Sequence, residues 1–379
     1  MNLAMRGFAL KGRCVRQYLP MSSTLIEFPK VDFAESFLLP GWQIPAKVPG
    51  AFSDCTLIVA TYKRPNEAMN LLKALAQRTD VPAEIVIADG SPELNLGERL
   101  ASWTTETPLP FDVVYASSPS GLTRQRNIGV DLSTREYVFF LDDDSLPLDN
   151  YFREIRNIFK GDSKKRIGAI GGSVVNELDK PISRRWKLRL ALGIVPRIQP
   201  MTYGACGTST PKGLISRFKG VRRVDVLPGC AFAFRREVLD RHRFSSFFDG
   251  YSQGEDLEMS LRVGAEWDVV CCGDAEVLHQ QAPAGRPTSA AKGRMEVRNR
   301  FFIWKRHRPV TRVIDRIRFW SDIALLGIFD ILHFIRRPWR TSDLAHATGL
   351  FRGACQCVFA PPRHTEPMTH TVYRLAKGK

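Results

Sequence analysis

The sequence predicts an α/β fold, a mostly parallel sheet flanked by helices, followed by a C-terminal helical extension. Two observations predict the sheet. Short apolar runs alternate with segments of helical periodicity from residue 56 onwards, and several of these runs end in polar residues where a turn begins. A third observation predicts the extension, because the composition becomes strongly basic after Lys292 and then apolar over 319–335.

The composition is that of a globular protein with an anionic partner. Of the 379 residues, 44% are hydrophobic, so the chain can bury a sizeable core and global disorder is excluded. The formal net charge of +16 predicts an anionic partner, which could be nucleic acid, anionic lipid or a phosphorylated substrate. The eight cysteines include no C-x-x-C pair, which argues against a structural zinc site and for a reducing compartment.

Composition also divides the chain into four segments. We expect residues 1–50 to be a flexible leader, because they lack clear periodicity and their apolar stretch is too short and broken for a secretory signal. Residues 51–160 and 161–290 are expected to form two halves of one α/β domain. A basic, amphipathic and helical extension is expected over 291–379.

The first half begins with a β-α-β unit. The run TLIVAT at 56–61 predicts a buried strand, residues 67–78 carry apolar side chains on one helical face, and AEIVIA at 83–88 predicts a second strand. A further strand at 111–116 and a helix at 122–132 continue the pattern. Such units place parallel strands side by side through right-handed crossovers, and ligands collect at the carboxyl ends of those strands.

The stretch YVFFLDDDSLP, residues 137–147, is the centre of the predicted site. Its apolar run ends in three carboxylates, and alternation along an extended chain places Asp142 and Asp144 on one side and Asp143 on the other. Two carboxylates on one side repel each other unless a cation or a proton lies between them, and carboxylate oxygens suit Mg²⁺ or Mn²⁺. The alternative is an acidic turn that ends the strand and caps the next helix, expected over 150–159.

A second acidic group begins a helix later in the chain. The glycine-rich stretch FFDGYSQGEDLEMSLRV, 247–263, leads into a helix whose first turn carries two carboxylates. Carboxylates are also favoured there by the helix dipole alone, which is the structural alternative to a catalytic role. The remaining predicted elements are a strand at 167–175, a short helix near 186–192, and strands at 224–234, 268–272 and 277–279.

The C-terminal segment combines basic and apolar residues. Arginines crowd the sequence before the apolar block 319–335 and follow it at Arg336, Arg337 and Arg340. The block is shorter than the roughly 20 residues of a membrane-spanning helix, so it predicts a helix in a membrane interface, with peripheral contact through 312–340. An ordinary helix packed on the domain is the alternative. Because the basic residues bracket an apolar block, we expect a membrane rather than nucleic acid as the partner.

Seven segments between residues 52 and 285 together resemble glycosyltransferase family 2, whose members include metal-dependent inverting enzymes with the GT-A fold. Each segment is weak evidence alone, but seven in the family's order at sensible spacings form a specific pattern. The segments are TLIVATYKRP, IVIADGS, GLTRQRNIGV, YVFFLDDDSLP, LPGCAFAFRREVL, FFDGYSQGEDLEMSLR and AEVLHQ. The resemblance implies a Rossmann-like GT-A sheet, with the nucleotide bound by 51–160 and with acceptor binding and catalysis in 161–290.

The resemblance also implies roles for individual residues. Asp142 and Asp144 would hold a Mn²⁺ or Mg²⁺ ion that bridges the donor diphosphate, with His279 as the third protein ligand. Asp256 would be the catalytic base, supported by Glu255, because an ionised carboxylate near the acceptor can take its proton. The residues that would line the nucleotide-sugar site are Thr61, Tyr62, Arg64, Asp89 (bonding the base), Arg124, Arg126, Asp143 and Gly229.

The predicted activity is transfer of a sugar from a nucleotide-diphosphate donor to a hydroxyl of a glycan or lipid-linked acceptor. We expect a role in cell-surface polysaccharide or glycolipid synthesis, in the cytoplasm at the inner face of the membrane. The Q-x-x-R-W signature of processive members is absent, which predicts a non-processive enzyme. The chain also departs from the family in one place, since Ala88-Asp89 supplies one acid where two are often found.

Two alternatives remain at this stage. A sugar nucleotidyltransferase also uses a metal and a nucleotide, but it would usually have a glycine-rich phosphate loop after its first strand, where this chain has TYKRPNE. A non-enzymatic protein that binds nucleic acid or membranes would also be basic. Nucleic-acid binding predicts basic residues interleaved with aromatic residues over one surface, and strongly salt-dependent binding of DNA.

Overall fold

The apolar runs of the sequence form the strands of one sheet, and polar residues occupy the turns at their ends. The structure is a computed structural model that describes residues 50–195, 199–210, 216–248, 250–308 and 310–362. The predicted leader therefore lies outside the described residues, apart from Gly50. Along the sheet the strand order is β3-β2-β1-β4-β8-β6-β9-β5, and β7 pairs with β9.

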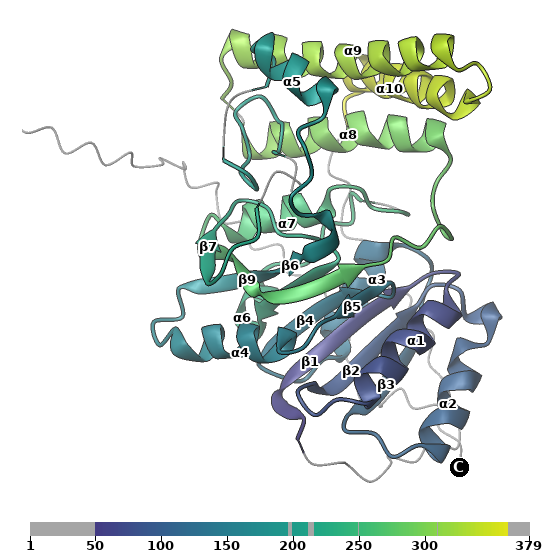
Figure 1. The fold of residues 1–379 in the computed structure, drawn as a ribbon, viewed down its shortest axis with the longest axis vertical. Helices are drawn as coiled ribbons and strands as arrows, with labels where there is room; N and C mark the ends of the chain where they lie inside the picture. The colour runs from purple at the N-terminus through teal and green to yellow at the C-terminus, as the bar shows by residue number, and fades with distance from the viewer. Residues whose placement is uncertain (1–49, 196–198, 211–215, 249, 309, 363–379) are drawn as a thin grey trace, which may run out of the picture. The chain divides into compact units, whose positions relative to one another are not determined.

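The first half of the sheet is parallel, as predicted (Figure 1). Its strands are β1 (Phe52–Thr61), β2 (Pro82–Asp89), β3 (Asp112–Ser117) and β4 (Tyr137–Asp142), and every neighbouring pair among them runs in the same direction. The connections contain the helices α1 (Pro65–Ala76), α2 (Leu96–Glu106) and α3 (Leu122–Leu132) and the short 3₁₀ helix η1 (Pro92–Leu94). Sequence patterning missed α2, whose buried face carries only two large apolar side chains.

Beyond β4 the sheet is mixed. Strand β8 (Ala231–Arg235) runs antiparallel to β4 and to β6 (Ile167–Val174), whereas β6 and β9 (Asp268–His279) are parallel. Two short strands pair antiparallel with β9, namely β5 (Ser145–Pro147) and β7 (Val221–Arg223). The predicted class, an α/β fold with a C-terminal helical extension, is confirmed.

Two strand predictions in this second half are wrong in detail. The strand expected over 224–234 is present only in its last part, as β8, whereas residues 224–230 form the connection from β7, where Pro228 cannot donate to a strand ladder. The strands expected over 268–272 and 277–279 are one strand, β9. Its pairing with β6 shifts register between Gly171 and Ser173, so a bulge carries the intervening residues of β9 without ending it.

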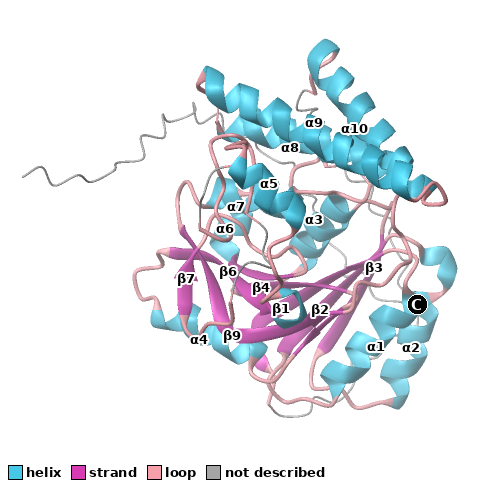
Figure 2. Ribbon diagram, turned by 45° about the horizontal axis from the view of Figure 1, so that its top comes forward, coloured by secondary structure: helices cyan, strands magenta, loops and turns pink. Residues whose placement is uncertain are grey.

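Alternation along the strands divides the apolar side chains between two cores. One core packs β1 to β4 against α1, α2 and α4 (Tyr151–Gly161). The other packs the opposite face against α3, α6 (Arg236–Arg241) and α7 (Glu255–Val263). Figure 2 shows helices on both faces of the sheet. Both faces are therefore buried, which explains why β1 and β4 are continuous apolar runs rather than alternating ones.

Helix α3 lies unusually close to β1. An ideal Cβ placed on Gly129 would lie 2.3 Å from Cγ2 of Ile58, which is buried in the middle of β1. Glycine permits this approach because it has no side chain. The consequence for the site is that α3 lies directly behind the carboxyl ends of β1 and β4.

We expect Gly129→Ala to destabilise the protein by ~1–3 kcal/mol, because the added methyl group must displace Ile58 or move α3. Denaturant unfolding would measure the change. Gly161→Ala is a matched control, since nothing lies within 4 Å of a Cβ at that position. Equal stability of the two variants would contradict the packing described here.

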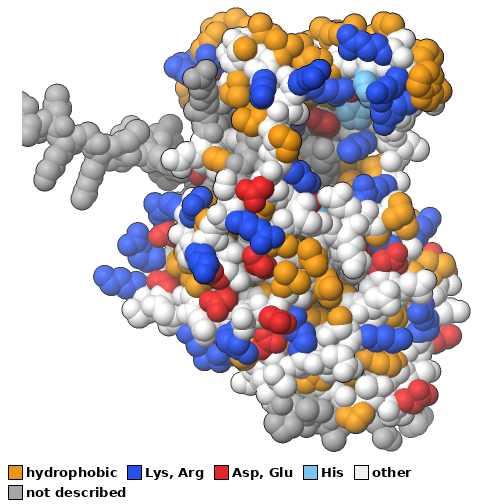
Figure 3. Space-filling view, viewed as in Figure 1, with side chains coloured by type: hydrophobic (Ala, Val, Ile, Leu, Met, Phe, Trp, Pro, Cys, Tyr) orange, Lys and Arg blue, Asp and Glu red, His pale blue; other side chains and the backbone are white. Residues whose placement is uncertain are grey.

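Three helices form the C-terminal extension, and a fourth from the middle of the chain packs against them. They are α8 (Ser289–His307), α9 (Val313–Arg336), α10 (Thr341–Phe359) and α5 (Arg184–Ala191). Glycines bring α8 and α10 together, because a Cβ on Gly349 would lie 2.1 Å from the carbonyl oxygen of Ala290. Among the described residues, no helix is both long and apolar enough to cross a membrane. Figure 3 shows hydrophobic side chains gathered along the outer edge formed by α9 and α10.

His346 of α10 makes two ion pairs within this extension. Its Nδ1 lies 2.7 Å from Asp330 Oδ2, and its Nε2 lies 3.6 Å from Glu296 Oε2. Hydrogen bonding to Asp330 and Glu296 raises the pKa of His346 to about 9, from a usual value of 6.5. The folded protein therefore holds this proton more tightly than the unfolded chain.

His346 should stabilise the fold fully below about pH 6.5, and this contribution should disappear as the pH rises through about 9. We expect His346→Gln to remove that part of the pH dependence, as measured by denaturant unfolding between about pH 5.5 and 10, roughly one unit beyond each end of the window. Asp330→Asn, which removes the first partner of the imidazole, should act in the same direction. An unchanged pH profile in both variants would show that the proton is not bound in this way.

Candidate active site

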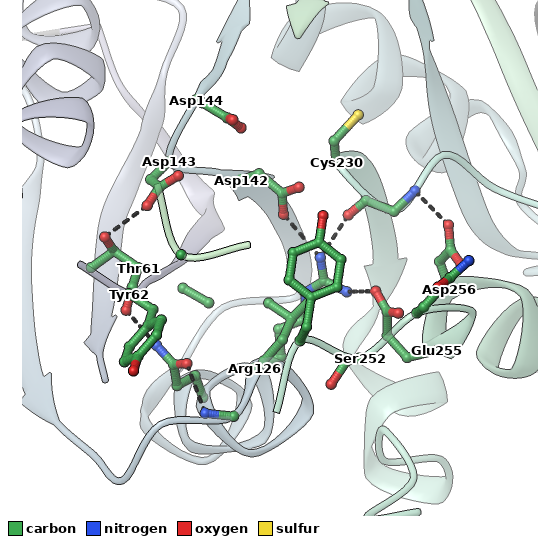
Figure 4. A pocket seen from close by; sticks show the side chains of 18 of the residues that line it. Thr61, Tyr62, Arg126, Asp142, Asp143, Asp144, Cys230, Ser252, Glu255 and Asp256 are labelled. Atoms are coloured by element: carbon green, nitrogen blue, oxygen red, sulfur yellow. Dashed lines mark hydrogen bonds and ion pairs between the residues drawn. The ribbon is translucent and has the colours of Figure 1, made fainter. Parts of the chain in front are cut away.

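The three carboxylates that follow β4 lie at the carboxyl edge of the parallel strands. Asp142 pairs with Ala60 in the register of β4 with β1, so the acids lie beside Thr61 at the end of β1. A cavity of about 490 Å³ opens at this edge, a size typical of small-molecule sites. In Figure 4 these acids line one side of the cavity and Glu255 and Asp256 line the other. All the predicted site residues except Asp89 and Arg124 line this cavity.

Asp142, Asp144 and His279 form a possible metal site. Each offers one ligand atom, and these atoms all lie within 4.8 Å of one another. The pairing of β5 with β9 brings them together, because Ser145 and His279 are partners in that ladder. Oδ1 of Asp144 is buried without a hydrogen-bond partner, and His279 Nε2 lies 3.4 Å from it. Two carboxylates and an imidazole around such an oxygen fit a divalent cation such as Mn²⁺ or Mg²⁺.

Glu177 orients the histidine of this group. Its Oε1 lies 3.1 Å from His279 Nδ1, which leaves Nε2 directed at Asp144. Burial alone would lower the pKa of His279, but hydrogen bonds with Asp144, Cys230 and Glu177 raise it to about 12. Carboxylates commonly hold metal-binding imidazoles in this manner. Sequence analysis missed Glu177, because it lies in the short 3₁₀ helix η2 (Val175–Glu177), where no periodic pattern marks it.

Asp143 points toward the loop after β1 and away from the possible metal site formed by Asp142, Asp144 and His279. Its Oδ2 accepts a hydrogen bond from Thr61 Oγ1 at 2.7 Å, and its Oδ1 accepts one from Arg64 Nη1 at 3.0 Å. Burial raises the pKa of Asp143 to about 7, against the opposing effect of these two donors. Arg64 also donates to the carbonyl oxygens of Ala282 and Ala284. Arg64 thus joins the β1 loop to the segment that follows β9.

Asp89 and Arg124 do not line the cavity. Oδ1 of Asp89 accepts hydrogen bonds from the backbone N–H and hydroxyl of Ser91, and Oδ2 accepts one from the hydroxyl of Tyr115. Burial raises the pKa of Asp89. Gln125 lines the cavity near the end of β2 instead. Its Nε2 donates to the carbonyl oxygens of Thr61, the last residue of β1, and of Ala88 in β2. In this structure Asp89 therefore holds the turn after β2. The nucleobase of a donor would have to compete with Ser91 and Tyr115 for its oxygens.

Arg126 of α3 connects the two sides of the cavity. Its Nη2 donates to Asp142 Oδ1 at 3.0 Å and to the carbonyl oxygen of Gly229 at 2.7 Å, and its Nη1 donates to Glu255 Oε1 at 3.0 Å. The guanidinium is buried against the ring of Phe232, 5.1 Å from its centroid. Arg126 was predicted to bind the nucleotide sugar. In this structure its guanidinium instead binds two carboxyl groups and a backbone carbonyl of the protein itself.

Asp256 lies in the first turn of α7, at the cavity wall. Its Oδ2 accepts a hydrogen bond from the backbone N–H of Gly229 at 3.0 Å. A Cβ at Gly229 would lie 2.8 Å from that same oxygen, so this close approach requires glycine. Burial, and then the charge of Asp256, raise the pKa of Glu255 to about 8. At neutral pH Glu255 is thus mostly protonated and less available to accept a proton than a carboxyl group of ordinary pKa.

Helix α8 supports the loop that leads into α7. Nδ2 of Asn299 donates to the carbonyl oxygen of Gln253 at 2.7 Å, and the ring of Phe302 stacks on Phe247 with centroids 3.6 Å apart. Glu258, which follows in α7, is completely buried and forms ion pairs with α8. The C-terminal extension therefore contributes directly to the position of Glu255 and Asp256.

A family model described as "Glycosyl transferase family 2" matches residues 56–243, which contain β1 to β8 and the three acids after β4. The chain belongs to glycosyltransferase family 2. It is therefore a glycosyltransferase, which confirms the resemblance noted in the sequence. A search of curated proteins found no significant match.

Solved structures with a similar fold are remote from this glycosyltransferase in sequence. One is a mannosyltransferase from Pyrobaculum calidifontis, PcManGT, in complex with GDP-Man and Mn²⁺ (15% identity, TM-score 0.48, covering 84% of this chain and 90% of that one). Another is GalNAc-T7 with UDP, GalNAc and Mn²⁺ (15% identity, TM-score 0.43), of which the match spans about half, 48%, while covering 64% of this chain. A third is a mycobacterial protein (12% identity, TM-score 0.42, covering 69% and 76%).

We expect Asp144→Ala to weaken Mn²⁺ binding by at least the ~10–100-fold that loss of an outer partner of a metal ligand causes. Manganese titration followed by electron paramagnetic resonance measures this without donor or acceptor. Asp149→Ala removes a carboxylate that is 99% exposed and serves as the control. Retention of Mn²⁺ affinity by Asp144→Ala would exclude this residue as a ligand.

Proposed function

We propose that this glycosyltransferase moves a sugar from a nucleotide-diphosphate donor to a hydroxyl of a glycan or lipid-linked acceptor, with inversion at the anomeric carbon. One observation supports the proposal most strongly. A single cavity has the group Asp142, Asp144 and His279 on one side and Asp256 on the other. In a displacement with inversion, the diphosphate leaves from one side of the anomeric carbon and the acceptor hydroxyl attacks from the other. The reaction therefore needs a charge-neutralising group on the first side and a proton acceptor on the second.

The donor would bind at the β4 edge. Asp142, Asp144 and His279 would hold a divalent cation, and Glu177 would keep the imidazole oriented. When bound, such a cation neutralises charge that develops on a departing diphosphate. Thr61 and Arg64 hold Asp143 beside this site, so the carboxyl groups of the edge are already positioned before a donor arrives.

The acceptor would bind on the side of α7. The Asp256 carboxylate would accept the proton of the attacking hydroxyl, while the backbone N–H of Gly229 holds its Oδ2 in place. Glu255 would support the base rather than replace it, because its raised pKa keeps a proton on it at neutral pH. Arg126 fixes the spacing of the two ends through its contacts with Asp142 and Glu255. A single displacement with one base leads to inversion.

We also propose that the enzyme is non-processive and acts in the synthesis of cell-surface polysaccharide or glycolipid, at the cytoplasmic face of the inner membrane. The missing Q-x-x-R-W signature supports the first point. The basic residues around the apolar stretch of α9 support the second. The residues that select the acceptor would come from 176–221, the long connection that contains α5 and, at its start, Glu177.

Asp256→Asn should retain donor binding and lower the rate of sugar transfer by ~10²–10⁴-fold, the usual contribution of a general base. Glu255→Gln should lower it less, because glutamine resembles the protonated form of Glu255. Release of nucleoside diphosphate from a panel of nucleotide sugars, with Mn²⁺ and candidate acceptors present, would measure the rates. Calorimetry would measure donor binding.

Asp274→Asn is the control for this experiment, because Asp274 is exposed and lies on β9 outside the cavity. Transfer by Asp256→Asn at the unmodified rate would show that another group takes the proton. A larger loss in Glu255→Gln than in Asp256→Asn would exchange the roles of the two carboxyl groups.

A further inference from the structure

Helix α9 has its charged side turned inward. Its three acids, Asp315, Asp322 and Asp330, are buried, with exposed fractions of 3%, 0% and 8%. They lie on one side of the helix, because the second and third follow the first by about two and four turns. A surface helix of a globular protein usually turns its charged residues outward, whereas α9 buries these acids on the same side as the apolar side chains of Phe319 and Ile323.

Two of the buried acids face basic residues of neighbouring helices, whereas Asp315 pairs with Arg312 and Arg318 close by in the sequence. Asp322 Oδ2 accepts hydrogen bonds from Arg189 of α5 at 2.7 Å and from Arg300 of α8 at 2.6 Å. Asp330 pairs with Arg185 of α5 and with His346 of α10. These pairs attach α9 to the rest of the protein through its polar side. Charge pairing and the packing of Phe319 and Ile323 in an apolar core together orient the helix, and its opposite side, which is also apolar, faces outward.

The outer face of α9 is a continuous apolar stripe. It lies opposite the acids, and Ile328, Ile331 and Ile335 in its C-terminal half are 49%, 44% and 63% exposed. Figure 3 shows hydrophobic side chains along this edge, with lysine and arginine side chains beside them. The exposed members of the stripe are Val313, Ile314, Ile317, Ala324, Ile328, Ile331, Leu332 and Ile335.

Arginines lie at both ends of the stripe. Arg312 at the start of α9 is 73% exposed and pairs with Asp315, and Arg340 beyond its end is 47% exposed and lies 3.9 Å from Asp343. Arg336 and Arg337 are also exposed. Because the acids of α9 all point inward, its outer side presents arginine and apolar side chains together. We propose that the outer face of α9 binds the surface of an anionic phospholipid bilayer, with the isoleucines in the interface and the terminal arginines on lipid phosphates.

A second copy of the chain fits this face less well. Both ends of α9 are basic, so a pair of such helices would place arginines beside arginines in the parallel and in the antiparallel arrangement. An anionic surface instead compensates both ends at once. It also accepts a long, narrow apolar stripe without requiring a shaped groove.

The test uses the full chain with vesicles of phosphatidylcholine, either alone or mixed with phosphatidylglycerol. We expect the unmodified protein to cosediment with the anionic vesicles much more than with the neutral ones. The double variant Ile328→Gln, Ile331→Gln should bind anionic vesicles ~10–100-fold more weakly. The control is Leu94→Gln, Val221→Gln, which removes two apolar side chains of similar exposure, 41% and 46%, from elsewhere.

A second pair of variants tests the arginines. Arg336→Gln with Arg337→Gln should weaken binding to anionic vesicles by roughly 5-fold per arginine, as expected for basic residues at a charged membrane surface. Lys73→Gln with Lys164→Gln removes the same charge from exposed positions on the catalytic domain and should bind unchanged. Thermal unfolding of every variant verifies that it is folded.

Three results would overturn the proposal: equal binding to neutral and anionic vesicles, unchanged binding by the α9 variants, or binding to neither vesicle. A dimer in sedimentation analysis that the isoleucine variant dissociates would instead assign the face to self-association. Vesicle binding requires neither donor nor metal. Failure of this inference is thus distinguishable from failure of the proposed sugar transfer, and Asp256→Asn should bind vesicles as the unmodified protein does.

Discussion

The site depends most on the hydrogen bonds and ion pairs that the buried guanidinium of Arg126 makes. Two carboxyl groups from distant parts of the chain, Asp142 and Glu255, converge on it, and it also holds the carbonyl oxygen of Gly229. Without the guanidinium, the buried carboxyl group of Glu255 would lack this donor and Asp142 would lose its charged partner. Arg126 can occupy this position because α3 packs closely on β1 through Gly129. A backbone contact thus allows the charge pairing that joins the two sides of the cavity.

The same principle organises the C-terminal extension. Buried acids of α9 pair with arginines of α5 and α8, so helices from different parts of the sequence become one layer. Helix α8 then supports the loop before α7 through Asn299 and Phe302. The extension consequently helps to form the cavity, since the position of Asp256 depends on a helix that begins more than 30 residues later.

Most elements of the first half of the fold could be predicted from sequence, because their strands are buried on both faces and read as unbroken apolar runs. Prediction was poorer where the pattern was interrupted. The strand expected over 224–234 is reduced to β8 by the turn at Pro228, and the continuity of β9 depends on a bulge opposite Gly171. The apolar block 319–335 was recognised, but its alternatives concerned which side of the helix would face the protein, and periodicity alone does not decide that.

What the sequence determined by itself was the set of chemical groups: three acids after a buried strand, two acids opening a helix, and a histidine that follows. Local order along the chain is enough to recognise these groups, since each belongs to a short contiguous motif. The tertiary structure decided their partners. Asp89 holds a turn instead of lining the cavity, Arg126 joins two carboxyl groups, and Glu177 orients His279. These relations arise from strand pairing and helix packing between residues far apart in sequence, so no local pattern encodes them.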